Sequence, residues 1–158
     1  MNRTLGPVAR RLARLPGRLY DWHLGWLLGR RFLRLTHVGR RSGRRYRTVL
    51  EVVGPGAQPG EVVVMAGLGH HADWFRNILA LPPVEVVIGR DRFRPQARVL
   101  DHEEAAAVLA AYEARNRLVA PVVRRVLSWL VGWQYDGSAA GRRRLVEQLP
   151  LVAFRRAD

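Results

Sequence analysis

The 158-residue sequence contains neither cysteine nor lysine. The absence of cysteine excludes disulfides, thiolate metal sites and cysteine nucleophiles, and it allows a reducing compartment without proving one. The absence of lysine excludes Schiff-base chemistry. All 27 basic residues are therefore arginine, and with 13 acidic residues they give a formal net charge of +14. This excess predicts an anionic partner, such as a phosphorylated cofactor, nucleic acid or an acidic membrane surface.

The sequence also lacks a convincing signal peptide and an apolar run long enough to span a membrane. The apolar stretch 22–28 is short, and Arg124 and Arg125 interrupt the stretch 118–133. We therefore expect a cytoplasmic protein. No Ser-His-Asp spacing, carboxylate pair, Walker-type loop or dinucleotide fingerprint is present. The length and the 48% hydrophobic content predict one domain, 1–158, with its own core.

The most informative stretch is 36–48, THVGRRSGRRYRT, which lies between two apolar, strand-like runs. Gly39 and Gly43 allow a partner to approach the backbone closely. Ser42 offers a hydroxyl, and the exposed amides of such a turn can form an anion-binding nest. Arginine forks match phosphate and carboxylate groups. The stretch therefore predicts an oxyanion clamp on a β-hairpin, and the alternative is a solvated basic turn that only joins two strands.

Apolar periodicity and turn residues predict an α+β fold, in which helices surround a small antiparallel β-barrel of about six strands. The predicted strands are 32–38, 45–54, 61–66, 84–88, 93–100 and 150–154, and Pro95 places the fifth at an edge or a bulge. The predicted helices are 7–31, 74–81 with Asp73 as N-cap, 102–116 with Asp101 as N-cap, 121–131, and one that Gly137-Ser138 opens. We divide the domain into an N-terminal helical segment (1–31), a barrel core (32–116) and a helical segment with the closing strand (117–158).

Several other features allow a functional and a structural interpretation. The basic amphipathic helix at 7–31 either packs on the domain or lies on an anionic membrane. The pair His70-His71 is a poor metal site, because no third ligand has suitable spacing, and it is better suited to a polar contact or to proton donation. The helix start that contains Asp73 and Trp74 either holds a ligand or belongs to the core. The same choice applies to the aromatic residues Tyr112, Trp129, Trp133 and Tyr135.

Three blocks of the sequence resemble the deazaflavin-dependent nitroreductase family, a branch of the flavin/deazaflavin oxidoreductases with a split β-barrel. Residues 36–48 are similar to its T-x-x-G-R-K-S-G-x-P-R-x-T turn. Residues 63–67 followed by 73–78 are similar to its V-V-A-S and W-Y-x-N-L segments, and residues 83–89 with 98–100 are similar to its N-P-x-V-x-V and A-R-V segments. The resemblance covers residues 32–116, and its specificity lies in the order and spacing of the blocks.

The resemblance implies the 8-hydroxy-5-deazaflavin coenzyme, F-420, whose tail carries a phosphodiester and several glutamates. By position, the phosphate and tail would contact Arg40, Arg41, Ser42 and Gly43, next to Gly39. The ring would lie against Thr48, Met65 and Ala66, with Asp73 and Trp74 at the neighbouring helix start. Two departures matter: the family's arginine is displaced by one position to Arg47, and its serine is Gly67. Alternation along the strand can turn Arg47 to the other face.

The resulting hypothesis is an F-420-dependent oxidoreductase that transfers a hydride to a conjugated small molecule of the nitro, quinone or enone type. Candidate proton donors are Tyr112, His70, His71 or water. The alternatives are a non-catalytic module that binds a polyanion, lipid or nucleic acid, and a split barrel that binds FMN. No specific nucleic acid is expected, because aromatic residues do not interleave with the arginine cluster as a base-stacking platform requires. By analogy with related barrels we expect a homodimer.

Overall fold

The computed structural model describes residues 29–158. Most of the helix predicted at 7–31, and the membrane contact proposed for it, therefore lie outside the described residues. Residues 29–31 form a turn and a bend. No helix in the described part of the chain is long and apolar enough to cross a membrane.

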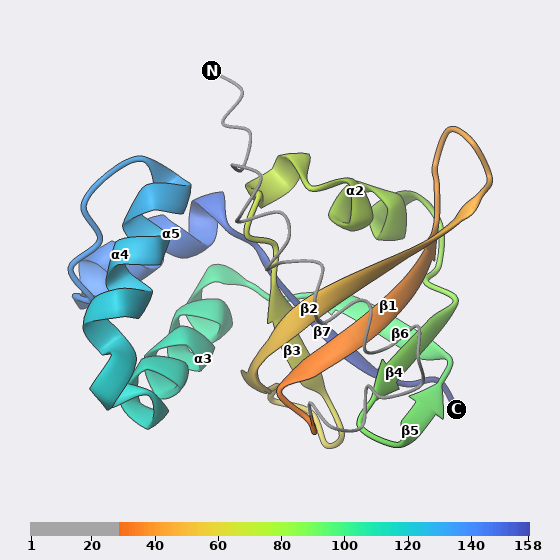
Figure 1. Cartoon of the computed structure of the whole chain (residues 1–158), viewed down its shortest axis with the longest axis horizontal. Helices are drawn as coiled ribbons and strands as arrows, with labels where there is room; N and C mark the ends of the chain where they lie inside the picture. Colours follow the sequence, from red (N-terminus) through yellow and green to blue (C-terminus); the bar gives the residue numbers. More distant parts are fainter. Residues whose placement is uncertain (1–28) are drawn as a thin grey trace.

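Within residues 29–158, seven antiparallel strands form one sheet in the order β5-β4-β1-β2-β3-β7-β6. The strands are β1 (Phe32–Val38), β2 (Arg45–Pro55), β3 (Val62–Met65), β4 (Glu85–Ile88), β5 (Asp91–Phe93), β6 (Pro95–Val99) and β7 (Leu151–Arg156). The helices are α2 (Asp73–Ala80), α3 (His102–Arg115), α4 (Ala120–Val131) and α5 (Ala139–Gln148), with short 3-10 turns at Gly69–His71 and Arg117–Val119. Figure 1 shows the sheet curling into a nearly closed barrel, with α2 above it and the other three helices together on one side. The predicted α+β split barrel is confirmed.

The strand count is one higher than predicted, because the segment predicted as a single strand at 93–100 is divided. The chain turns at Gly89 and Arg90, and Asp91 and Arg92 already belong to β5, before the start of the segment predicted as a strand. Pro95 has no N–H to donate, and the chain leaves β5 at Arg94 to form β6 at the opposite edge of the sheet. The amide of Ala157 donates to the carbonyl of Arg94 (2.9 Å), which extends the β6–β7 ladder beyond Pro95.

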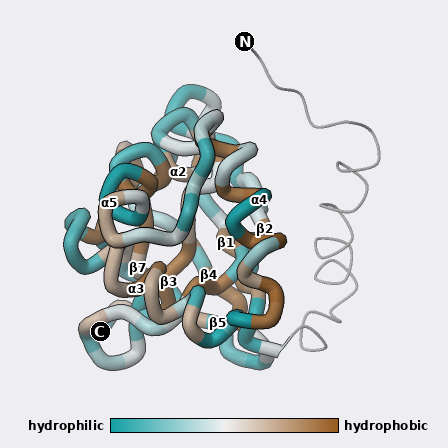
Figure 2. The backbone as a smooth tube through the Cα atoms, turned by 90° about the vertical axis from the view of Figure 1, so that its left-hand side faces the viewer, coloured by the Kyte–Doolittle hydropathy of each residue, from teal (hydrophilic) through white to brown (hydrophobic). Residues whose placement is uncertain are grey.

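The sheet separates two apolar cores. The first lies inside the barrel below α2, and the second lies between the sheet and helices α3, α4 and α5. Strand β3 contributes to both, because Val62 and Val64 face the barrel interior while Val63 faces the helices. Strand β7 alternates in the same way, and these strands appear as hydrophobic stretches of the tube in Figure 2. Burial on both faces explains why these short segments are apolar at consecutive positions.

One of the two predicted helix caps is present, and the helix predicted to open at Gly137-Ser138 is also capped. The Asp101 side chain accepts from the Glu104 amide (2.8 Å) at the start of α3. Ser138 accepts from the Gly141 amide (3.0 Å) at the start of α5. The prediction for Asp73 was wrong: it is the first residue of α2 and Ala72 occupies the cap position, so the Asp73 side chain is available for another contact.

The β1–β2 register determines which side chains reach the site. Leu33 of β1 pairs with Leu50 of β2, Leu35 pairs with Thr48, and His37 pairs with Tyr46. Leu33, Leu35 and Leu50 belong to the barrel core. Since successive side chains alternate between faces, His37, Tyr46 and Thr48 lie on this same inner face, at the end of the hairpin closest to α2.

Candidate functional site

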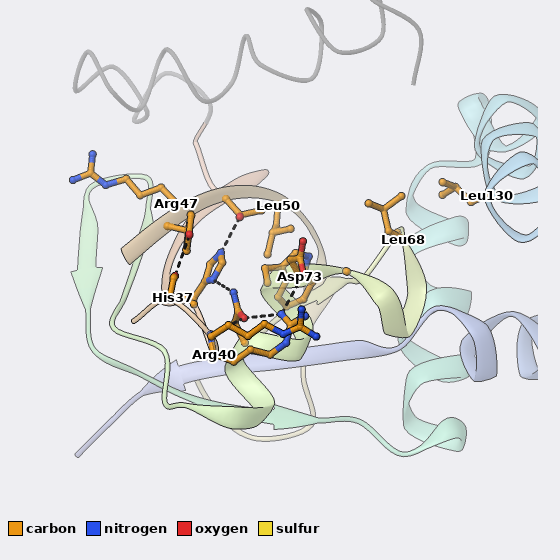
Figure 3. A pocket seen from close by; sticks show the side chains of 16 residues that line it. His37, Arg40, Arg47, Leu50, Leu68, Asp73 and Leu130 are labelled. Carbon is orange, nitrogen blue, oxygen red and sulfur yellow. Dashed lines mark hydrogen bonds and ion pairs between the residues drawn. The ribbon is translucent and has the colours of Figure 1, made fainter. Parts of the chain in front are cut away.

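A cavity of about 770 Å³ lies between the β1–β2 turn, the start of α2 and Leu130 of α4 (Figure 3). Its volume is typical of a cavity that holds a small organic ligand or cofactor. Nine of the predicted cofactor-binding residues line it: Gly39, Arg40, Arg41, Ser42, Arg47, Thr48, Gly67, Asp73 and Trp74. The three that do not line it are Gly43, Met65 and Ala66. The structure therefore brings most of the predicted set together, and their cofactor contacts stay a prediction.

The two glycines of the turn serve different purposes. A Cβ at Gly39 would lie 2.5 Å from the Ser42 hydroxyl and 2.7 Å from the Tyr46 ring, so only glycine fits there. Gly43 has a φ of +67° and open space around it, so its requirement is conformational. The turn is closed by the Gly39 amide donating to the Arg44 carbonyl (2.8 Å) and by the Gly43 amide donating to the Gly39 carbonyl (2.9 Å).

Hydrogen bonds within the protein leave few free amides for the predicted anion-binding nest. The Arg40 amide donates to Asn77 Oδ1 (3.1 Å), and the Arg44 amide donates to Ser42 Oγ (3.3 Å). Within the described residues, the amides of Arg41 and Ser42 are then the two in the turn that have no acceptor. The turn can therefore bind an anion mainly through its side chains.

Arg40 and Arg41 present very different guanidinium groups. Arg40 is 20% exposed, and its Nη1 donates to Asn77 Oδ1 (2.9 Å) and to Asp73 Oδ1 (3.2 Å). These contacts attach the turn to α2 and occupy one nitrogen of the fork. Arg41 is exposed and makes no hydrogen bond or ion pair with the described residues. Arg41 is thus free to move onto a ligand, whereas Arg40 is already oriented.

A buried polar network continues from Arg40 into the cavity wall. Asn77 Nδ2 lies 3.1 Å from His37 Nδ1, and His37 Nε2 lies 3.1 Å from Thr48 Oγ1. His37 is 3% exposed and its ring stacks on Tyr46 with 5.9 Å between centroids. Burial lowers the pKa of the His37 imidazole below its ordinary 6.5, and the nearby Asp73 carboxylate opposes part of that shift. The imidazole is therefore neutral near pH 7.

Arg47 lines the cavity but differs from Arg40 in the direction of its side chain. It precedes Thr48 on β2, and alternation places it on the opposite face of the strand. In Figure 3 its side chain extends away from the cluster that contains His37, Arg40 and Asp73. The Arg47 side chain therefore points to the other face of β2, as alternation along the strand allowed.

The three candidate proton donors do not line this cavity. Tyr112 lies on α3, beside a separate cavity, and its hydroxyl donates to Glu51 Oε1 (3.2 Å). Burial, followed by the Glu51 carboxylate, raises the pKa of Tyr112. His70 Nε2–H donates to the Glu147 carbonyl (2.9 Å), and His71 is exposed in the same 3-10 turn. Their role as donors stays a prediction, which the cavity's lining does not support.

The aromatic residues of the C-terminal half also lie elsewhere. Tyr135 is buried in the helical core, Tyr112 and Trp133 pack against that core, and Trp129 is 46% exposed on α4. None of them lines the cavity.

Seven lining residues were not predicted: His37, Tyr46, Leu50, Leu68, Ala72, Asn77 and Leu130. Alternation from Thr48 could have identified Tyr46 and Leu50, because all three positions share one face of a strand. Leu130 carries no such signal, since only the packing of α4 brings it to the cavity.

The structure thus combines a split β-barrel with a cavity of coenzyme size beside an arginine-rich turn. Residues 20–122 match the sequence model described as "F-420H(2)-dependent quinone reductase". The chain belongs to this family, which confirms the resemblance seen in the sequence. It is accordingly an F-420-dependent oxidoreductase that acts on a small molecule, and F-420 is its coenzyme.

Solved structures show more distant similarity. An F-420-H2 dependent reductase (FDR-A) has 18% identity and a TM-score of 0.44, with 80% of this chain and 96% of that chain covered. An FMN binding protein related to pyridoxamine 5'-phosphate oxidase, from Nostoc punctiforme, has 17% identity and a TM-score of 0.47, with 97% and 82% covered. A chain described as a domain-swapped dimer has 17% identity and a TM-score of 0.45, with 89% and 99% covered. A search of curated proteins found no match.

Proposed function

We propose that the cavity beside the β1–β2 turn binds F-420 and that the enzyme passes a hydride from the reduced coenzyme to a quinone-type acceptor. The observation that carries this proposal is that the cavity has both an apolar side and a cationic side. Leu50, Leu68, Trp74 and Leu130 provide an apolar wall, whereas the turn provides arginines. A flat ring joined to a polyanionic tail requires both surfaces, so the residues fit the group.

The side chains have distinct roles in this proposal. Arg41 moves onto the anionic tail, and the remaining nitrogens of the Arg40 fork extend the same cationic surface. Trp74, at the start of α2, and Leu50 exclude water from the ring. When bound, F-420 supplies a two-electron hydride transfer. The quinone takes up a proton in addition to the hydride, and the reduced coenzyme loses one when it is oxidised, so proton exchange with water balances the reaction.

The first test is equilibrium binding of oxidised F-420, followed by its fluorescence. Arg41→Ala should weaken binding at least tenfold, because a charge-assisted hydrogen bond contributes about 1.5–3 kcal/mol. Arg143→Ala is the matched control: it removes the same charge from an exposed position on α5, outside the cavity, and should bind like the wild type. Equal losses in both variants would mean that net charge rather than the turn holds the coenzyme.

The acceptor is tested with the reduced coenzyme and three acceptor classes. A quinone should give a higher kcat/KM than a nitroaromatic compound or an enone of similar size. FMN and a short DNA duplex serve as competing ligands in the binding assay. Tight binding of either one without binding of F-420 would overturn the proposal.

A further inference from the structure

The donors and acceptors of the buried network can be assigned from its geometry alone. Two donors of Arg40, its backbone N–H and its Nη1, both point at one Asn77 side-chain atom, at 3.1 and 2.9 Å. An amide nitrogen in that position would face two donors without an acceptor. The Asn77 oxygen must therefore face Arg40, and its Nδ2–H group must face His37.

The orientation of Asn77 in turn determines the His37 tautomer. Because Asn77 Nδ2 can only donate, His37 Nδ1 must accept at 3.1 Å, and the proton of the neutral ring lies on Nε2. Nε2–H then donates to Thr48 Oγ1 at 3.1 Å. The Thr48 hydroxyl accepts this bond, and its own hydrogen has no acceptor among the described residues. Thr48 lines the cavity, so this hydrogen can be donated to a ligand.

We propose that Arg40, Asn77 and His37 form a one-directional hydrogen-bond chain that orients the Thr48 hydroxyl as a donor to an acceptor atom, such as a ring carbonyl, of the bound coenzyme. His37 and Asn77 are positioning residues, and Thr48 is the residue that touches the ligand. The inference rests on the proposed coenzyme site, but the chain itself can be tested without the coenzyme.

The chain makes the site sensitive to acid. Protonation of His37 would place N–H groups of His37 and Asn77 face to face and break the chain. Asp73 on α2 favours the protonated ring, whereas burial opposes it. Arg40 lies beyond Asn77, and the Tyr46 ring stacks on the imidazole. Glu85 of β4 pairs with Arg34 on the other face of β1 (3.6 Å), so it does not face the imidazole.

The chain is tested first by imidazole 15N NMR on the free protein, with the His37→Gln spectrum used to assign the His37 signals. The expected result is a neutral ring with the proton on Nε2 that persists below pH 6.5. Asn77→Asp replaces the donor with an acceptor, so it should favour an N–H at Nδ1 and move the titration of His37 to higher pH. A proton on Nδ1 in the wild type, or an unchanged titration in Asn77→Asp, would overturn the chain.

The contact with the ligand is tested by F-420 titration of two Thr48 variants. Thr48→Val keeps the shape and removes the hydroxyl, so binding should weaken roughly three- to tenfold, the effect of one neutral hydrogen bond. Thr48→Ser keeps the hydroxyl and should bind almost like the wild type. Equal affinity of the valine variant and the wild type would overturn the inference while the proposed function stands. A wild type that does not bind F-420 would overturn the proposed function, and the NMR result would then decide the chain.

Discussion

Replacing Arg98 with methionine should destabilise the protein, because Arg98 is the cationic partner of the buried Glu61 carboxylate. Glu61 has a side chain that is only 2% exposed, and Arg98 binds it through Nε (3.1 Å) and Nη2 (2.9 Å). Arg98 also donates to both oxygens of Glu104, at 2.7 and 2.8 Å. Methionine keeps most of the apolar volume but leaves the Glu61 carboxylate buried without its cationic partner. Removing one partner of a buried ion pair costs about 3–5 kcal/mol.

The assay is urea unfolding at pH 7, with Arg155→Met as the matched control. Arg155 lies on the neighbouring strand β7, and among the described residues its side chain bonds only to Gln96 at an exposed site, so its replacement should change stability by less than about 0.5 kcal/mol. The unfolding free energy should fall by about 3–5 kcal/mol in Arg98→Met. Equal effects in the two variants would refute the reasoning, because they would show that Glu61 does not depend on its partner.

The pH dependence gives a second check on the same variant. Hydrogen bonds from Arg98 lower the pKa of Glu61 and of Glu104 below the ordinary 4.5. A lowered pKa of an acid means that this stability is complete above pH 4.5 and is lost as pH falls through the lowered value. Without Arg98, burial should raise the pKa of Glu61 instead. The stability difference between wild type and Arg98→Met should therefore narrow as the pH falls toward 4.5, and a constant difference would contradict this account.

Two further predictions concern a buried hydrogen bond and a tightly packed glycine, both outside the cavity. Tyr135→Phe should cost about 1–3 kcal/mol in urea unfolding, because the Tyr135 hydroxyl donates to the buried Glu113 carboxylate; no loss would mean that Glu113 is solvated or satisfied by other groups. Gly69→Ala should lower the melting temperature more than Gly60→Ala. Both glycines have a positive φ, but a Cβ at Gly69 would also lie 2.8 Å from the Gln148 carbonyl, whereas Gly60 faces open space. Equal shifts would show that backbone strain alone determines the effect.

Much of the fold follows from local rules that the sequence makes visible. Pro95 could be placed at a sheet edge because it cannot donate to a ladder, and the structure puts it at the start of the edge strand β6. Asp101 and Ser138 could be identified as caps because each precedes a helical segment and carries a short acceptor side chain. Asp73 met the same criterion, but its carboxylate pairs with Arg40 instead. This contact joins segments distant in sequence, so local sequence rules do not predict it.

The candidate site, too, could be predicted from the sequence only in part. Residues of the turn could be predicted because glycine, serine and arginine at that spacing have recognisable chemistry. The role of Asn77 depends on how α2 packs over β1, 40 positions away in sequence from His37. The candidate donors Tyr112 and His70 have suitable chemistry, but they bond to Glu51 and to the Glu147 carbonyl outside the cavity. Residue type indicates which chemistry is available, whereas location depends on packing between segments distant in sequence.

Arg40 shows why a purely local interpretation of the turn is incomplete. Its backbone and Nη1 orient Asn77, and through Asn77 they select the His37 tautomer at the ring end of the proposed site. Its remaining nitrogens belong to the cationic end. Arg40→Ala should therefore affect both the anionic tail and the Thr48 hydroxyl, whereas Arg41→Ala should affect the tail alone. Because most of the turn amides are bonded within the protein, we expect side-chain charge and the orientation of Asn77, rather than a backbone nest, to determine ligand affinity.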